Sequence, residues 1–244
     1  MKREQRLWFS QSLSHDMELI VYGHAGQPVI AFPSQDGRAA DWEAFGMVDA
    51  CYDLLEGGRL LLITVDGVDW QSWTNAAAPV HERARRNDDY QRYIVEEVVP
   101  FARELSGSQS VWVTGCSMGA FHASNAFFRR PDAIDGLIAL SGLYQPTLFV
   151  GDYSDDHVYF HSPLYYLPNL NDSWHLERYR RSRIVFCCGQ GAWEDECLRD
   201  TRAIQRILEE KGVPATFDYW GHDVEHHWYW WKKMLRRHLS VLER

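Results

Sequence analysis

One short motif places a serine where it could act as a nucleophile. Ser117 lies at the centre of Gly115 to Gly119 (GCSMG), which fits the G-x-S-x-G pattern. Residues 110–114 before it predict a strand, and residues 118–128 after it predict a helix. Between strand and helix, the two glycines allow close approach and the serine is held in a sharp, strained turn at the sheet edge. The pattern therefore predicts Ser117 as a nucleophile; an ordinary glycine-rich turn is the alternative.

A serine hydroxyl is a weak nucleophile, and it needs a base that takes its proton. In this setting the base is a histidine that follows the last strand. Three histidines follow the strand predicted over residues 215–220, namely His222, His226 and His227. Carboxylates lie among them, but no HExxH or comparable ligand spacing occurs, so we expect neither a metal nor another cofactor.

The base in turn needs an acid that orients it, and in chain order this acid lies between the serine and the histidine. The strand predicted over residues 183–188 is followed by the adjacent carboxylates Glu194, Asp195 and Glu196. Glu194 and Glu196 would also suit the N-terminus of the helix that follows, because a helix N-terminus favours negative charge. The residues alone leave the choice open.

Acyl transfer also needs two backbone N–H groups that point at the developing oxyanion. One is expected from Met118, the residue after the nucleophile. The other is expected from the loop that follows the strand at residues 29–32. Pro33 has no N–H, so Gln35 is the preferred donor and Ser34 the second choice. A plain Pro-Gly turn is the alternative for this loop.

The elements that would position these side chains alternate regularly between strand and helix. This order predicts one α/β domain over residues 1–244, with a mostly parallel sheet and helices on both faces. In such sheets, ligands bind beyond the carboxyl ends of the strands. Residues 142–181 break the rhythm and predict an irregular excursion over the active-site edge. Strands are predicted at 17–23, 28–33, 59–65, 110–114, 134–141, 183–188 and 215–220, and helices at 41–56, 80–105, 118–128, 196–211 and 226–243.

The composition excludes several classes of partner. The formal net charge is −9, and no basic run offsets it, so nucleic acid and anionic membranes are not expected to bind. No apolar run approaches the ~20 residues that span a bilayer. The basic N-terminus is not followed by a signal-peptide core, and the five cysteines have irregular spacings. We therefore expect a cytoplasmic protein with reduced thiols.

The chain resembles the putative-esterase family of the α/β-hydrolases, which contains esterase D-like, feruloyl-esterase-like and mycolyltransferase-like proteins. The resemblance covers about residues 28–242 and is strongest at residues 115–120 and near the C-terminus. There the family shows a histidine followed at set intervals by a tryptophan, a further aromatic residue and a leucine. These places are filled by His226, Trp228, Trp231 and Leu235.

The resemblance implies the α/β-hydrolase fold and a choice among the candidate residues. It favours His226 as the base, with His222 as the next candidate. The family places its acid about seven residues before a helical Arg or Asn, a place that Arg202 fills. This spacing favours Asp195, with Glu194 next. The implied catalytic set is therefore Ser117, Asp195 and His226.

The implied activity is that of a serine carboxylic-ester hydrolase acting on a small-molecule ester through an acyl-enzyme. An acyltransferase with the same three residues and a non-catalytic binding protein on the same fold are the alternatives. We also consider a homodimer, although no segment identifies an interface. Aromatic residues in the excursion could line a substrate pocket, but they do not select a substrate.

Overall fold

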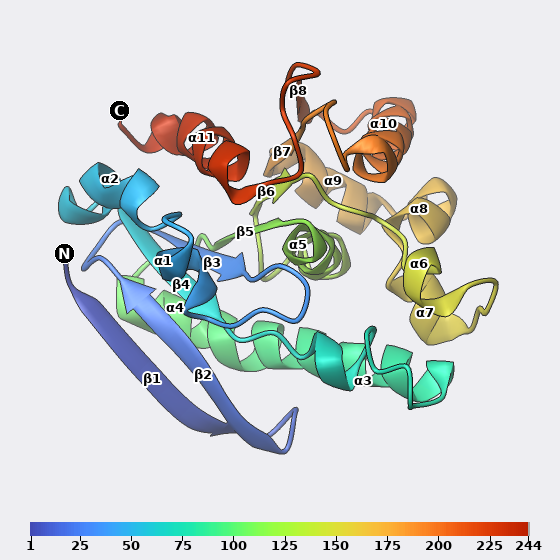
Figure 1. Ribbon diagram of the computed structural model, residues 1–244, viewed down its shortest axis with the longest axis horizontal. Helices are drawn as coiled ribbons and strands as arrows, with labels where there is room; N and C mark the ends of the chain where they lie inside the picture. The colour runs from blue at the N-terminus through green and yellow to red at the C-terminus, as the bar shows by residue number, and fades with distance from the viewer. Residues whose placement is uncertain (244) are drawn as a thin grey trace.

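A single eight-stranded sheet forms the centre of the protein in the computed structural model, which describes residues 1–243 (Figure 1). The strand order is β1-β2-β4-β3-β5-β6-β7-β8. All neighbours from β4 to β8 pair in parallel, whereas β1 and β2 are antiparallel additions at one edge. The strands are β1 (Arg3–Ser10), β2 (His15–Tyr22), β3 (Gln27–Phe32), β4 (Leu60–Val65), β5 (Trp112–Cys116), β6 (Gly136–Leu140), β7 (Arg183–Cys188) and β8 (Thr216–Tyr219).

Helices cover both faces of this sheet, as the strand-helix alternation predicts. On one face α3, α4, α5, α9 and α10 contribute buried side chains to a single apolar cluster. On the other face α1, α2 and α11 contribute to a second cluster. The helices are α1 (Asp41–Ala44), α2 (Tyr52–Glu56), α3 (Val80–Tyr93), α4 (Val99–Ser106), α5 (Met118–Arg129), α6 (Thr147–Val150), α7 (Asp156–Phe160), α8 (Pro163–Tyr166), α9 (Ser173–Arg181), α10 (Asp195–Glu210) and α11 (Trp228–Leu239).

The central strands are apolar on both sides because both of their faces are covered. In β4, Leu61 and Ile63 pack into the first cluster, while Leu60 and Leu62 pack into the second. This two-sided burial explains the continuous apolar runs in the sequence. The predicted α/β fold with a mostly parallel sheet is therefore confirmed.

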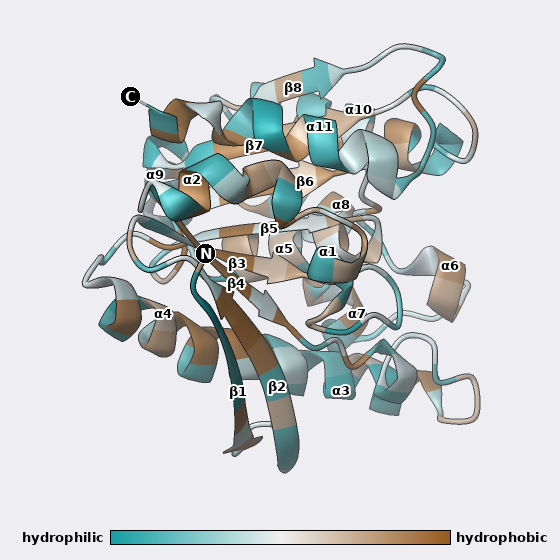
Figure 2. Cartoon of the chain, turned by 60° about the vertical axis from the view of Figure 1, so that its left-hand side comes forward, coloured by the Kyte–Doolittle hydropathy of each residue, from teal (hydrophilic) through white to brown (hydrophobic). Residues whose placement is uncertain are grey.

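Within the first 60 residues, two elements differ from the sequence-based expectation. Residues 3–10 form the edge strand β1, which the sequence did not predict because its side chains are largely polar and exposed; in Figure 2 it is mostly teal, beside the browner β2. The helix expected at 41–56 is broken into α1, a 3₁₀ turn and α2, and Gly46 has a positive φ of 76° at the break.

The excursion at residues 142–181 contains short helices rather than irregular chain. It holds α6, α7, α8 and α9, joined by a 3₁₀ turn and loops. No helix within residues 1–243 is both long and apolar enough to cross a membrane.

Parallel strands bring their carboxyl ends to the same edge of the sheet. The segments that follow β3, β5, β6, β7 and β8 therefore meet there, although they are far apart in the chain. Four of these segments carry the predicted site residues, at Gln35, Ser117, Asp195 and His226.

A substitution at Phe186 of β7 can test how the core supports this edge of the sheet. Its ring is fully buried and contacts the rings of Phe128, Tyr144 and Phe217. We expect Phe186→Ala to lower the free energy of unfolding by about 3–5 kcal/mol, because a large cavity replaces the ring. Urea unfolding measures this loss. The control Leu7→Ala, at a side chain that is 66% exposed, should change the value by less than about 0.5 kcal/mol. Equal effects of the two substitutions would contradict this account of the core.

Candidate active site

Ser117 occupies a strained turn between β5 and α5. Its backbone has φ 58° and ψ −122°, a conformation that L-residues rarely adopt. A Cβ on Gly115 would lie 2.2 Å from the backbone of Gly119, and a Cβ on Gly119 would lie 2.4 Å from the Pro33 carbonyl oxygen. Only glycine fits at both places, so strand, helix and the loop after β3 can approach closely. The Ser117 N–H donates to the Leu140 carbonyl at 2.9 Å, which holds the turn against β6.

The structure brings one of the three candidate histidines to Ser117. His226 Nε2 lies 2.8 Å from Ser117 Oγ. The backbone N–H of His226 donates to the Ala192 carbonyl at 3.0 Å. The His226 ring packs edge-on against the Trp231 ring, with 4.8 Å between the ring centroids. The first contact fixes the backbone of His226, and the second packs against its ring.

The other two histidines have different surroundings. His222 is exposed, and its Nδ1 lies 3.3 Å from the Gln190 carbonyl oxygen. His227 caps the N-terminus of α11, where its Nδ1 accepts a hydrogen bond from the Tyr229 N–H at 3.2 Å. Neither has a hydrogen bond to Ser117 within the described chain.

The carboxylate beside the histidine differs from the sequence-based expectation. Glu194 Oε2, and not Asp195, lies 3.2 Å from His226 Nδ1. Glu194 is the fully buried residue before α10, whereas Asp195 is the exposed first residue of that helix. Consecutive residues at a helix start point about 100° apart around the axis, so only one can face inward. The turn that ends at Glu194 directs this side chain inward. The family spacing counts positions along the chain and gives no information on this direction.

Buried Glu194 has further hydrogen-bond partners, as a buried carboxylate requires. Ser141 Oγ donates to Glu194 Oε1 at 2.6 Å. Cys188 Sγ lies 3.6 Å from Oε2 as a weak donor. Ser141 has a positive φ of 48° directly after β6. The sequence analysis did not single out Ser141, and its only signal was its place at the end of the strand predicted over residues 134–141.

The two expected oxyanion donors line one cavity together with Ser117. Gln35, Met118, Ser117 and His226 all line it. Met118 is the first residue of α5, where a backbone N–H has no intrahelical acceptor. Among residues 1–243, neither the Gln35 N–H nor the Met118 N–H has a hydrogen-bond acceptor. Ser34, the second choice, is not among the residues that line the cavity.

This cavity has a volume of about 470 Å³ and a mixed wall. Its volume is in the range of small-molecule sites. Trp193 stands at its rim with 87% of its surface exposed and a positive φ of 66°. The sequence reasoning did not single out this tryptophan. Apolar side chains dominate the rest of the wall, with Met118, Leu143, Leu148 and Phe149, and two carboxylates, Asp195 and Glu196, complete it.

Glu194, Cys197 and His226 also offer potential metal ligand atoms within 4.8 Å of one another. Cys197 Sγ lies 3.9 Å from His226 Nδ1. Burial raises the pKa of the Cys197 thiol well above its usual value, whereas metal binding requires the thiolate. With His226 Nε2 directed at Ser117, the chemistry of this set fits proton transfer better than metal binding.

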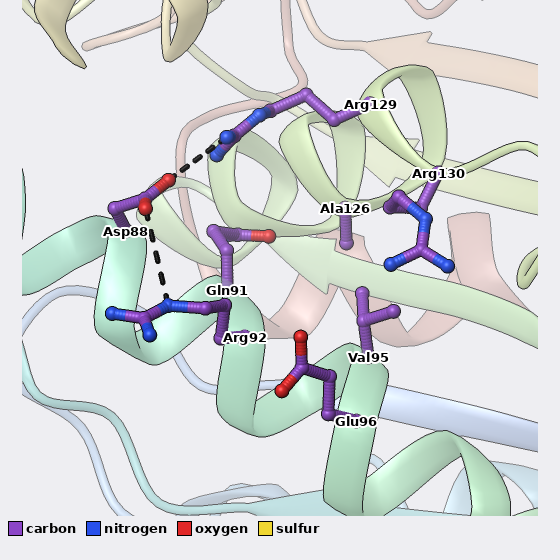
Figure 3. Close-up of a pocket in the computed structure, with 8 residues that line it drawn as sticks. All are labelled: Asp88, Gln91, Arg92, Val95, Glu96, Ala126, Arg129 and Arg130. Carbon is purple, nitrogen blue, oxygen red and sulfur yellow. Dashed lines mark hydrogen bonds and ion pairs between the residues drawn. The ribbon is translucent and has the colours of Figure 1, made fainter. Parts of the chain in front are cut away.

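A second cavity, of about 240 Å³, lies between α3 and α5 (Figure 3). Arg129 donates to Asp88 at 2.8 Å across it, and Arg92 also faces that carboxylate at 4.0 Å. These charges are satisfied within the wall. None of the predicted site residues lines this cavity.

Comparison with known proteins identifies the family of the chain. The sequence model of the family described as "Putative esterase" matches residues 10–242. No curated protein matches the chain in sequence. The resemblance expected from the motifs is thus confirmed at the level of the family.

Solved structures share the fold at low sequence identity. A ferulic acid esterase aligns with a TM-score of 0.77 at 17% identity, over 99% of this chain and 96% of its own. The S-formylglutathione hydrolase (FrmB) of Staphylococcus aureus aligns with 0.74 at 14% identity, over 100% and 96%. MPT51 (FbpC1) of Mycobacterium tuberculosis aligns with 0.71 at 14% identity, over 99% and 98%. At these identities the likeness establishes the fold alone.

A substitution at Gly119 can test the close approach between α5 and the loop after β3. In Gly119→Ala, the new Cβ would clash with the Pro33 carbonyl oxygen, so the loop after β3 must move away from α5. We expect labelling of Ser117 by a fluorophosphonate to slow by at least about tenfold, because small misplacements of reacting groups cost that much or more. Mass spectrometry of the intact protein follows the labelling, and circular dichroism checks the fold.

Gly107→Ala is the matched control, since Gly107 caps α4 and a Cβ there would contact nothing within 4 Å. Its positive φ makes the substitution mildly destabilising, but labelling should proceed at the wild-type rate. A folded Gly119→Ala protein that is labelled as fast as the wild type would contradict the assigned role of this glycine.

Proposed function

Because the chain belongs to the family described as "Putative esterase", and is thus an esterase of the α/β-hydrolase fold, we propose that it hydrolyses carboxylic esters through an acyl-enzyme on Ser117. The observation that carries the proposal is the chain of contacts from Ser117 Oγ to His226 Nε2 at 2.8 Å and from His226 Nδ1 to Glu194 at 3.2 Å. A nucleophile, a base and an orienting acid in contact are what ester cleavage by a serine requires.

In the first half of the reaction, His226 Nε2 takes the proton of the Ser117 hydroxyl while Oγ attacks the ester carbonyl carbon. The carbonyl oxygen becomes an oxyanion, which the N–H groups of Gln35 and Met118 stabilise. The N-terminus of α5 adds a favourable electrostatic contribution. The intermediate then expels the alcohol, which receives its proton from His226, and the acyl group remains on Ser117.

In the second half, a water molecule attacks the acyl-enzyme with His226 again as the base. The carboxylic acid product then leaves for solvent, and Ser117 regains its proton from His226. Throughout, Glu194 holds His226 in the tautomer that leaves Nε2 free to accept, and it stabilises the imidazolium that forms. In this proposal Glu194 takes the part that the sequence-based expectation gave to Asp195, and Ser141 orients Glu194.

The proposal is tested by hydrolysis of p-nitrophenyl acetate and butyrate. Ser117→Ala and His226→Ala should lose nearly all activity, because the nucleophile or its base is absent. Glu194→Gln should lower kcat by about 10²–10⁴, since an amide fails to stabilise the imidazolium and favours the wrong tautomer. Asp195→Asn is the matched control at the neighbouring carboxylate and should stay within about threefold of the wild type.

Each variant is checked for folding by circular dichroism before its rate is interpreted. If the wild type hydrolyses neither ester and is not labelled by a fluorophosphonate, the proposal fails. If Asp195→Asn loses activity and Glu194→Gln does not, the assignment of the acid is wrong. Added alcohol that captures the acyl group in preference to water would identify an acyltransferase instead.

The cavity wall suggests the kind of ester that fits. Trp193 combines two unfavourable features, an almost fully exposed indole and a positive φ that costs a bulky residue about 1–2 kcal/mol. Such a cost beside a nucleophile is consistent with a binding role for the side chain. A flat apolar or aromatic group of the substrate could lie on the indole. Asp195 and Glu196 have no ion-pair partner among residues 1–243, and they should disfavour anionic esters.

The variant Trp193→Ala tests this preference. Its hydrolysis of vinyl acetate, vinyl benzoate and benzyl acetate is measured as acid release in a pH-stat. We expect kcat/KM for the preferred aromatic ester to fall about three- to tenfold, the usual value of an aromatic contact. Vinyl acetate should change by less than about twofold. Trp174→Ala removes another exposed tryptophan, on α9 and outside the cavity, and should change none of the three. Equal losses for all esters would contradict a stacking role.

A further inference from the structure

A second, fully buried histidine–carboxylate pair lies beneath the oxyanion loop, which is residues 33–39. His122 Nε2 lies 2.8 Å from Asp69 Oδ1, and both side chains are about 1% exposed. His122 belongs to α5, the helix that begins at the nucleophile, and Asp69 begins a 3₁₀ turn after β4. The two are 53 positions apart in the chain. The mechanism above uses neither of them.

The second oxygen of this carboxylate reaches the oxyanion loop. Asp69 Oδ2 accepts the N–H of Asp36 at 3.1 Å. Asp36 is the neighbour of Gln35 and has a positive φ of 55°, so its backbone conformation needs support. Its own Oδ1 accepts the Thr74 hydroxyl at 2.6 Å. Asp69 therefore links α5 to the residue next to one oxyanion donor.

Further contacts join the loop to the same segment after β4. The Gly67 N–H donates to the Gly37 carbonyl at 3.1 Å, and the Ala39 N–H donates to Asp66 Oδ1 at 2.9 Å. These contacts fix the loop relative to β4 only. The His122–Asp69 pair is different, because it ties the loop to the helix whose first residue, Met118, supplies the other oxyanion donor.

We propose that His122 and Asp69 are positioning residues that set the spacing between the Gln35 and Met118 N–H groups. The proposal rests on the proposed ester hydrolysis, since it concerns the oxyanion of that reaction. Oxyanion donors are effective only when they are held close to their working geometry before the charge develops. One donor lies on a loop and the other on a helix, so a rigid connection between the two is needed.

The surroundings of the pair favour this role over simple core filling. The His122 ring packs among Phe32, Tyr90 and Phe121. An apolar side chain would suit such a pocket at least as well as a histidine. Moreover, His122 Nδ1 is buried without a hydrogen-bond partner in the described chain, which is costly. What the polar pair provides, and an apolar pair would not, is the acceptor for the Asp36 N–H.

The test therefore separates stability from loop anchoring. Asp69→Leu removes the acceptor and leaves His122 buried and unpaired, so it should lower both stability and kcat. In the double variant Asp69→Leu/His122→Phe, both partners are apolar, and stability should recover because no polar side chain is left unpaired between them. The Asp36 N–H still has no anchor, so we expect kcat to stay roughly ten- to a hundredfold below the wild type, with KM within about threefold.

Asp69→Asn is the conservative variant. Its amide oxygen can accept the Asp36 N–H while its NH₂ faces His122 Nε2, which can act as acceptor in the other tautomer. We expect it to keep most of the wild-type kcat. The control His238→Phe alters another buried histidine beside a carboxylate, 3.0 Å from Asp218 on the α11 face of the sheet, and should leave kcat and KM unchanged.

Three measurements decide the outcome for each variant, which are urea unfolding, kcat and KM for p-nitrophenyl butyrate, and the Ki of an aryl trifluoromethyl ketone. The ketone forms a hemiketal oxyanion on Ser117, so its Ki should rise in parallel with the loss of kcat. A double variant whose kcat and Ki recover together with its stability would overturn the positioning role. A wild type inert toward esters would instead refute the proposed function, and this inference with it.

Discussion

The backbone turn at Ser117 is the constraint on which the site depends. A residue with φ 58° and ψ −122° is held there because Gly115 and Gly119 let β5, α5 and the loop after β3 touch. The strain of about 1–3 kcal/mol is local, while the parallel strands on either side of β5 are buried on both faces and resist relaxation. The same turn places Met118 and the loop residue Gln35 on one cavity.

The buried carboxylate imposes a second requirement. Glu194 lies fully out of solvent, where an unpaired charge would be costly. Ser141, Cys188 and His226 surround it, and each comes from the end of a different strand or from the segment after one. The Glu194 carboxylate is thus held by residues at the edge of the sheet rather than by its own helix. Buried contacts of this kind keep the imidazole aligned without the mobility of an exposed pair.

Much of the fold and part of the candidate site could be predicted from the sequence. The two-sided apolar runs and their alternation with helical segments indicated a parallel sheet, because burial on both faces leaves a continuous apolar pattern. The G-x-S-x-G pattern in its strand-to-helix context indicated Ser117, and a Cβ at Gly115 or Gly119 would indeed clash with neighbouring backbone. The family spacing to Trp228 and Trp231 distinguished His226 from its neighbours, and Trp231 does pack on that ring. The edge strand β1 escaped prediction because its side chains are mostly polar.

The sequence by itself determined the fold class and pointed to Ser117, because these depend on local patterns of burial and glycine. The three candidate histidines stayed open on the residues alone, and only the spacing of the family favoured His226. Tertiary structure alone decided that Glu194 rather than Asp195 faces the histidine, since the two are adjacent and differ only in direction at the start of a helix. It alone joined His122 to Asp69. Contacts between residues distant in the chain leave no local pattern, and they exist only once the strands have set the distances between their loops.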